Sequence, residues 1–402
     1  MSRFLFVFDI GFDRNGPSVH LLQEILRAAL ERGHWVEVIL KDTGGPNEEM
    51  PAEFRENERF CYHVLPAKDE KGRGFISRYL DEVLYAGSCG RVAGKAGRFD
   101  AVFLQSCTTA IFYMAALRKL RCPILFNVQD IFPYNLKLSG QMPACAVTFP
   151  VFRLLQHLAY RRAGGIITIS QDMKDTLIGD GVDPEKIGVV YNWSYGDSPI
   201  SLESIPRDRV CDLSLDRSKT NVIYAGNIGR MQNVELIAET ASLMAEDPGF
   251  HFYVIGGGAN RERIEQMTEG LRNLTMLPMQ PAEFAESIYA QADVNLIPLA
   301  PGVVRTALPS KTATVLRTDR PVIFCVDRSS KLSSLLEGDG QASVADCRSP
   351  SDLARAIRES AAGSTEAGGN YRLFCRYFKK SNAGKYIDAM EELAGARKAA
   401  GL

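Results

Sequence analysis

The chain has 402 residues, of which 46% are hydrophobic and 24% charged, and a formal net charge of -1. This composition is typical of a globular protein with room for two domains, and the balanced charge gives no reason to expect a nucleic-acid partner. Nine cysteines occur without a CxxC pair, which argues against a zinc site or a disulfide framework and favours a reducing compartment. We find no cleavable signal pattern and no apolar run of the roughly 18 residues that a membrane span needs. We therefore expect a cytoplasmic protein.

The first half of the chain alternates between short apolar runs and helical patterns. Runs that predict strands cover residues 4–10, 35–40, 61–65, 101–105, 123–128, 165–169 and 187–191. Residues 18–32 predict a helix, because apolar side chains recur every three or four positions from Val19 to Ala29. Continuous apolar strands separated by helices are typical of a parallel sheet that is covered on both faces.

The alternation stops at residues 192–219, which are rich in serine, glycine and proline, and then begins again. Strands are predicted at 221–225, 250–255, 274–277, 294–298, 321–326 and 342–345, and a helix at 370–394 that packs back across both domains. The predicted fold is α/β, with two doubly wound, Rossmann-like parallel-sheet domains. The expected parts are an amino-terminal domain (1–195), a linker (196–219), a second domain (220–372) and carboxyl-terminal helices (373–402) that return toward the first domain. Such an arrangement places a ligand cleft between the carboxyl ends of two sheets.

The start of the second domain has the pattern of a phosphate-binding turn. The apolar run 221–225 ends at glycine, and an amphipathic helix follows from about Gln232. Such a turn leaves backbone N–H groups exposed at the positive end of a helix dipole, where an anion is favoured. Arg230 lies in the turn, and its guanidinium can donate two parallel hydrogen bonds to a diphosphate. The other residues assigned to this site are Gly226, Asn227, Gly229, Gly256 and Gly257.

In eight segments the chain resembles the retaining glycosyltransferases of the GT-B fold, in particular family 4 of the glycosyltransferases. The segments, in the order in which that family has them, are Gly16 with 31–34, 130–133, 167–170, 186–193, 224–230, 292–294, 309–311 and 320–322. The nearest match is to bacterial enzymes that build O-antigen and capsule polysaccharides, including those that transfer an N-acetylfucosamine-type sugar. The resemblance covers nearly the whole chain.

The resemblance implies that a sugar moves from a nucleotide diphosphate to an acceptor hydroxyl with its anomeric configuration kept. It also implies that the second domain holds most of the donor and the first domain the acceptor. We expect a UDP-linked donor and a saccharide or polyprenyl-diphosphate-linked acceptor. No cofactor is expected beyond the nucleotide sugar. Gly16 precedes a helix, and its neighbours' amides are expected to meet the donor phosphates. The alternative for Gly16 is a tight turn in which glycine tolerates positive φ.

Arg230 and Lys311 are the residues that we assign to the departing diphosphate, because fixed cations can stabilise its growing negative charge in place of a metal. The chain contains no Asp-x-Asp motif, so we predict metal-independent transfer. Lys311 is expected in the first turn of a helix, a poor place for a cation unless an anion binds there; the alternative is a solvated surface lysine. The same segment contributes Leu308, Pro309, Ser310 and Thr314 to the predicted nucleotide-sugar site.

This segment departs from the commoner family pattern. Many members have two glutamates eight residues apart, and the matching positions here are Thr306 and Thr314, neither of which is a carboxylate. Many members also have a lysine after the first strand of the second domain, and the matching position here is near Gln232. The ribose contact and the donor identity therefore stay open.

Asp130 is the third predicted catalytic residue, because it ends a buried strand. Its carboxylate could orient a sugar hydroxyl or accept the acceptor's proton, and the alternative is a helix cap or turn. Gln129 stands where many relatives have a histidine. In the scheme commonly proposed for this fold, the departing phosphate takes the proton and no enzymic nucleophile is needed.

A membrane contact is expected from residues 131–171, which contain no acidic side chain but interleave basic and apolar ones. Such a surface could rest on an anionic inner leaflet, and an ordinary domain helix is the alternative. Two other functions stay open: a nucleotide-sugar 2-epimerase without NAD, and a non-catalytic sugar-nucleotide binding protein. The five histidines show no metal-ligand spacing, so no metal site is predicted.

Overall fold

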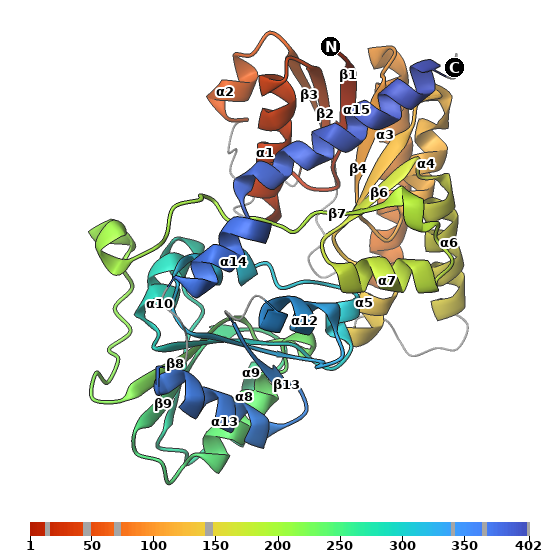
Figure 1. Cartoon of the computed structure of the whole chain (residues 1–402). Helices are drawn as coiled ribbons and strands as arrows, with labels where there is room; N and C mark the ends of the chain where they lie inside the picture. The colour runs from red at the N-terminus through yellow and green to blue at the C-terminus, as the bar shows by residue number, and fades with distance from the viewer. Residues whose placement is uncertain are drawn as a thin grey trace. The chain divides into compact units, whose positions relative to one another are not determined.

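The computed structural model describes residues 1–12, 17–42, 50–67, 74–140, 148–338, 342–363 and 368–399 (Figure 1). It divides into two compact units. Unit 1 comprises Met1–Asn135, Pro143–Tyr191 and Ser381–Leu402, and unit 2 comprises Leu136–Met142 and Asn192–Lys380. Each unit is built around its own parallel sheet, so the predicted fold class, two doubly wound α/β domains, is confirmed.

Unit 1 contains a seven-stranded sheet in the order β3-β2-β1-β4-β5-β6-β7. All of its strand pairs are parallel. The strands are β1 (Arg3–Val7), β2 (Trp35–Asp42), β3 (Phe60–Pro66), β4 (Ala101–Gln105), β5 (Ile124–Val128), β6 (Gly165–Thr168) and β7 (Ile187–Val189). The middle strands β4 and β5 are mainly apolar and are buried along their whole length. Each contains one polar residue, and Asn127 of β5 donates a hydrogen bond to Gln105 of β4 at 2.8 Å.

Helices cover this sheet, and the last helix of the chain is one of them. The helices in the first half of the chain are α1 (Pro17–Glu31), α2 (Ala52–Arg55), α3 (Phe75–Ala96), α4 (Ala110–Leu117), α5 (Tyr134–Leu138), α6 (Thr148–Arg162) and α7 (Gln171–Gly179). Helix α15 (Ala383–Ala399) contacts α1 and β4. Arg32 pairs with Asp388 at 2.6 Å, and His34 contacts Glu391 at 2.8 Å. The carboxyl-terminal helix is thus part of unit 1.

Unit 2 contains a six-stranded parallel sheet in the order β10-β9-β8-β11-β12-β13. Its strands are β8 (Thr220–Asn227), β9 (Phe250–Gly257), β10 (Leu274–Leu277), β11 (Val294–Pro298), β12 (Val322–Val326) and β13 (Ser343–Asp346). Its helices are α8 (Val234–Leu243), α9 (Arg261–Met267), α10 (Ala285–Gln291), α11 (Thr312–Arg317), α12 (Lys331–Gly338), α13 (Pro350–Ala361) and α14 (Gly369–Tyr377). The core of the unit lies between this sheet and helices that include α8 and α13.

Residues 192–219 contain two short 3-10 turns, Leu202–Ser204 and Arg207–Arg209. They contain no α-helix and no β-strand. They are nevertheless attached to unit 2, because Ile200 and Ile205 are buried against Ala290 of α10. In the described part of the chain, no helix is both long and apolar enough to span a membrane.

Candidate functional site

The carboxyl ends of β8 and β9 approach each other closely in unit 2. The parallel register pairs Gly226 with Gly256 and Asn227 with Gly257. Gly226 has a φ of +148° and Gly256 one of +159°, and a Cβ atom on Gly256 would lie 1.9 Å from the carbonyl oxygen of Gly226. Only glycine fits at position 256, so strand packing explains this residue without a ligand.

A short 3-10 turn separates β8 from helix α8. This turn covers Arg230–Gln232, Asn233 is left-handed with φ +48°, and α8 begins at Val234. The Asn233 side chain donates a hydrogen bond to the Cys347 carbonyl at 2.8 Å and so anchors the bend. The predicted helix start near Gln232 therefore lies two residues early, because Asn233 interrupts the helical backbone.

Lys311 reaches the same end of β8 from the start of α11. Its Nζ donates to the Ala225 carbonyl at 2.8 Å and lies 3.9 Å from the centre of the Tyr224 ring. A Cβ atom on Gly226 would be 3.1 Å from this Nζ, so glycine there leaves room for the ammonium. Within the described residues Lys311 makes no ion pair, and burial lowers its pKa to about 7. It is not a solvated surface lysine.

Arg230 is the second cation at this end of the sheet. It is exposed at the start of the 3-10 turn and has neither an ion pair nor a side-chain hydrogen bond to the described residues. Arg261 behaves differently, since it donates to the carbonyls of Gly256 and Leu277 and pairs with Glu265 at 2.7 Å. Arg230 and Lys311 thus supply positive charge that no described acidic side chain neutralises, which favours an anionic ligand.

The segment before α11 contributes groups of different accessibility. Ser310 is exposed, Pro309 is half-buried and Leu308 is buried. Thr312 is buried, and its hydroxyl has no hydrogen-bond partner in the described structure. Sequence reasoning missed this hydroxyl and also the Tyr224 ring, because neither residue type signals a site by itself.

The hydroxyl groups of the two threonines at the family's glutamate positions contact other groups of unit 2. The Thr306 hydroxyl donates to the Val303 carbonyl at 3.1 Å and is buried. The Thr314 hydroxyl lies 3.2 Å from that of Ser194. Asn227 is exposed, with its Nδ2 3.3 Å from Gln232 Oε1. A Cβ atom on Gly229 would lie 2.8 Å from both side chains of that pair.

Asp130 belongs to unit 1, just beyond the carboxyl end of β5. Burial raises the pKa of its carboxyl group to about 6, although Asn135 donates a hydrogen bond to it. Gln129 donates to Asn127 at 2.9 Å and lies 3.4 Å from the Tyr386 hydroxyl, so a polar network fixes its amide. A carboxyl group with this pKa changes charge near neutral pH, which suits a role in proton handling or sugar binding. Gly16 lies outside the described residues.

Comparisons with known proteins agree with this architecture. Residues 15–193 match the family described as "Glycosyl transferase 4-like domain", and residues 219–362 match "Glycosyl transferases group 1". A protein of Pseudomonas aeruginosa named "Probable glycosyltransferase WbjE" is 24% identical over 67% of this chain and 68% of its own length. The "Putative colanic acid biosynthesis glycosyl transferase WcaI" of Escherichia coli is 27% identical over 44% of this chain and 46% of its own length.

Solved structures with the same fold cover almost the whole chain. Sucrose-phosphate synthase of Thermosynechococcus elongatus has a TM-score of 0.76 at 13% identity, over 98% of this chain and all of that one. The Anabaena protein HepE, in a complex with UDP and glucose, has a TM-score of 0.66 at 16% identity, with the same coverage. The fold and these matches define a glycosyltransferase of GT-B architecture. More particularly, the chain belongs to the glycosyltransferases that join a Glycosyl transferase 4-like domain to a group 1 domain.

Proposed function

We propose that the chain is a retaining, metal-independent glycosyltransferase that uses a UDP-linked sugar. Its acceptor is a saccharide or a polyprenyl-diphosphate-linked saccharide of O-antigen or capsule assembly. The observation that carries this proposal is the pair of unneutralised cations, Arg230 and Lys311, at the carboxyl end of β8. The name of WbjE supports glycosyl transfer, that of WcaI supports a role in polysaccharide biosynthesis, and the UDP bound to HepE supports the nucleotide.

Arg230 and Lys311 stabilise the leaving group in this reaction. As the bond between the sugar C1 and the diphosphate oxygen breaks, negative charge builds on that oxygen. A buried ammonium such as that of Lys311 interacts with this charge more strongly than a solvated one, and it is in place before the reaction. Arg230 adds two donors in a planar arrangement that matches a phosphate. Positive side chains thereby do the work that a divalent metal does elsewhere.

Retention of configuration follows when the new bond forms on the face that the diphosphate leaves. The acceptor oxygen bonds to C1, and its proton passes to the departing phosphate oxygen, so no enzymic nucleophile is consumed. Asp130 contributes by accepting a hydrogen bond from a sugar hydroxyl when it is ionised. Its position at the end of β5 in unit 1 agrees with a role toward the acceptor.

A lipid-linked acceptor is supported by an exposed apolar surface on unit 1, which we call the α3–α6 face. Five large apolar side chains on two neighbouring helices are between 39% and 65% exposed: Leu80, Leu84, Val151, Leu154 and Leu158. The rings of Tyr79 on α3 and Phe152 on α6 are 5.1 Å apart, so the helices are adjacent. Arg161 and Arg162 lie in the last turn of α6. We infer that this face rests on an anionic inner leaflet and makes the enzyme a peripheral membrane protein.

The test is an assay of the purified protein with a panel of nucleotide sugars and a lipid-linked acceptor, with and without EDTA. We expect transfer from a UDP-sugar that EDTA does not abolish, giving a product of the donor's anomeric configuration. An epimerised donor in the absence of acceptor would instead indicate a 2-epimerase. Binding of the donor without turnover under any condition would indicate a non-catalytic binding protein.

A further inference from the structure

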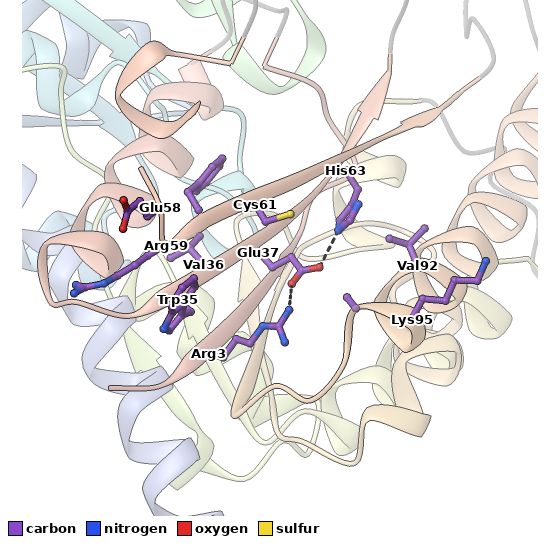
Figure 2. Close-up of a pocket in the computed structure, with 12 residues that line it drawn as sticks. Arg3, Trp35, Val36, Glu37, Glu58, Arg59, Cys61, His63, Val92 and Lys95 are labelled. Carbon is purple, nitrogen blue, oxygen red and sulfur yellow. Dashed lines mark hydrogen bonds and ion pairs between the residues drawn. The ribbon is translucent and has the colours of Figure 1, made fainter. Parts of the chain in front are cut away.

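A cluster of three potential metal ligands lies on one face of the unit 1 sheet, near the amino-terminal ends of β2 and β3. The parallel register places Glu37 opposite Cys61 and Ile39 opposite His63. Paired residues share a face, and alternate residues of a strand return to it. Glu37, Cys61 and His63 are therefore on the same side of the sheet, as Figure 2 shows.

Within the described residues, these three side chains are the group whose geometry fits a metal ion. One ligand atom from each lies within 4.8 Å of the others. His63 Nε2 is 2.8 Å from one Glu37 oxygen, and Arg3 Nη2 is 2.6 Å from the other. Glu37 is buried, whereas Cys61 is exposed and His63 is partly exposed on the edge strand.

The cluster opens into a cavity of about 660 Å³, which is also lined by Trp35, Arg59 and Lys95 (Figure 2). This volume is within the range of small-molecule sites, about 300–1,000 Å³. The opening matters because three protein ligands leave one position of a tetrahedral site free for water or another small ligand.

We propose that Glu37, Cys61 and His63 bind a divalent transition-metal ion of the zinc class, with the fourth position facing the cavity. A thiolate, an imidazole and a carboxylate together suit Zn²⁺, whereas Mg²⁺ and Ca²⁺ prefer oxygen ligands alone. The ion takes the position of the proton between His63 Nε2 and Glu37, which moves to His63 Nδ1 or to solvent, and the Cys61 thiol releases its proton to solvent as it becomes a thiolate ligand. Arg3 keeps its bond to the second carboxylate oxygen and so orients the Glu37 ligand.

The required rearrangement is small. Zinc bonds of about 2.0–2.3 Å in tetrahedral geometry place the ligand atoms about 3.3–3.7 Å apart. Ligand atoms that now lie up to 4.8 Å apart must therefore close by about 1 Å or less, and His63 Nε2 and the Glu37 oxygen, now 2.8 Å apart, must separate by about 0.5 Å. Cys61 and His63 can supply this movement by rotating their side chains, because they lie on an edge strand and are not fully buried.

A different reading of the cluster is an ion-pair network of Arg3, Glu37 and His63 that needs neither a metal nor the thiol. The two readings differ in the role of Cys61. A bound metal would be coordinated by the Cys61 sulfur, whereas the ion-pair network of Arg3, Glu37 and His63 does not include Cys61. Substitution of Cys61 therefore separates them, and the exposed position makes Cys61→Ser a variant that we expect to fold.

The experiment titrates the metal-free full-length protein with Zn²⁺ and, separately, with Co²⁺. We expect one ion per chain, a thiolate-to-cobalt charge-transfer absorption, and a rise in Tm of at least about 5 °C at a hundredfold excess over Kd. Cys61→Ser should abolish the charge-transfer band, and Cys61→Ser and His63→Gln should each weaken binding at least tenfold. The matched control is Cys122→Ser, a partly buried cysteine of the same unit, which should bind as the wild type does.

Three results would overturn the proposal. They are the absence of stoichiometric binding, binding that Cys61→Ser and His63→Gln leave unchanged, and a cobalt spectrum without thiolate absorption. If Cys61→Ser or His63→Gln fails to fold, the wild-type cobalt spectrum still decides whether a thiolate ligand is present.

Discussion

Each end of α11 carries a cation, the half-buried Lys311 at the first end and the buried Arg317 at the last, and the two have different partners. Arg317, in the last turn, donates to the Ser198 carbonyl and the Ser194 hydroxyl, each at 2.9 Å, and pairs with Glu286 at 3.0 Å. Lys311, at the first end, has the Ala225 carbonyl at 2.8 Å and no acidic partner in the described residues. A buried cation with a full set of partners holds the fold together. One without them costs stability unless an anion binds.

The largest effect on stability should come from the paired end of the helix. Arg317→Met leaves the Glu286 carboxylate and the Ser198 carbonyl without their donor, and one partner lost from a buried pair costs about 3–5 kcal/mol. Because Glu286 is 38% exposed, we expect a value near 3 kcal/mol. Urea unfolding measures it, and the exposed Arg263→Met serves as control. A loss below about 1 kcal/mol would contradict the structural role.

Substitution of Lys311, at the first end of α11, should lower activity and leave stability intact. Lys311→Met should lower kcat roughly a hundredfold or more, because it removes a fixed charge from the leaving diphosphate. It should not destabilise the protein, since it removes a buried charge. Steady-state transfer rates and urea unfolding of the same samples test both statements. Lys331→Met, at the start of α12, is the matched control and should keep the wild-type rate.

The stability of the Lys311 variant also has an expected dependence on pH. The pKa of Lys311 is lowered from 10.5 to about 7 on folding, so between these values the unfolded chain binds more protons than the native one. Wild-type stability therefore gains from this group as pH rises from 7 toward 10.5. The advantage of Lys311→Met over the wild type should be greatest at pH 7 and below, and should shrink as the pH rises. A constant difference would show that the ammonium is not desolvated.

Arg230 is a third case beside Arg317 and Lys311, because it has no acidic partner among the described residues but is exposed. Arg230→Ala should lower kcat about a hundredfold, with Arg230→Lys restoring part of the rate, because an ammonium keeps the charge but loses the planar pair of donors. Stability should change by less than about 0.5 kcal/mol, as for other exposed substitutions. A wild-type rate in the alanine variant would show that the phosphate binds elsewhere.

The smallest expected effect is the pH profile of kcat/KM. The rate should fall below about pH 6, where the Asp130 carboxyl takes up its proton, and above about pH 7, where Lys311 of the free enzyme loses its own. Asp130→Asn should remove the acidic limb, and Lys311→Arg should move the alkaline limb upward. A wild-type profile that is flat from pH 5 to 8 would contradict both assignments.

Most of the fold could be predicted from apolar runs alone. The strands 101–105, 274–277 and 294–298 were predicted with the bounds that the structure gives, because apolar residues dominate each of these short runs. The helix predicted at 370–394 is instead two helices, α14 and α15, with a 3-10 turn at Lys380–Asn382 between them. Helical periodicity continues across such a break, so the sequence does not reveal it.

The site was harder to predict, because its properties depend on residues that are distant in sequence. The order of glycine, Arg230 and Lys311 along the chain predicts an anion site, and both that site and the assignment of these residues to catalysis stay predictions. The contact of Thr314 with Ser194 spans 120 residues.

The cluster of Glu37, Cys61 and His63 could not be predicted without the register of β2 with β3. The Cys-x-His spacing on a predicted strand was the one available signal, since it places both side chains on one face.

The enclosed ammonium of Lys311 has a consequence for how nucleotide uptake would be measured. With a pKa of about 7, about half of the free protein carries a neutral amine at pH 7. A diphosphate beside it favours the ammonium, so docking of the donor draws a proton from the buffer. The calorimetric heat should therefore vary with the buffer's ionisation enthalpy, and this variation should vanish in Lys311→Met.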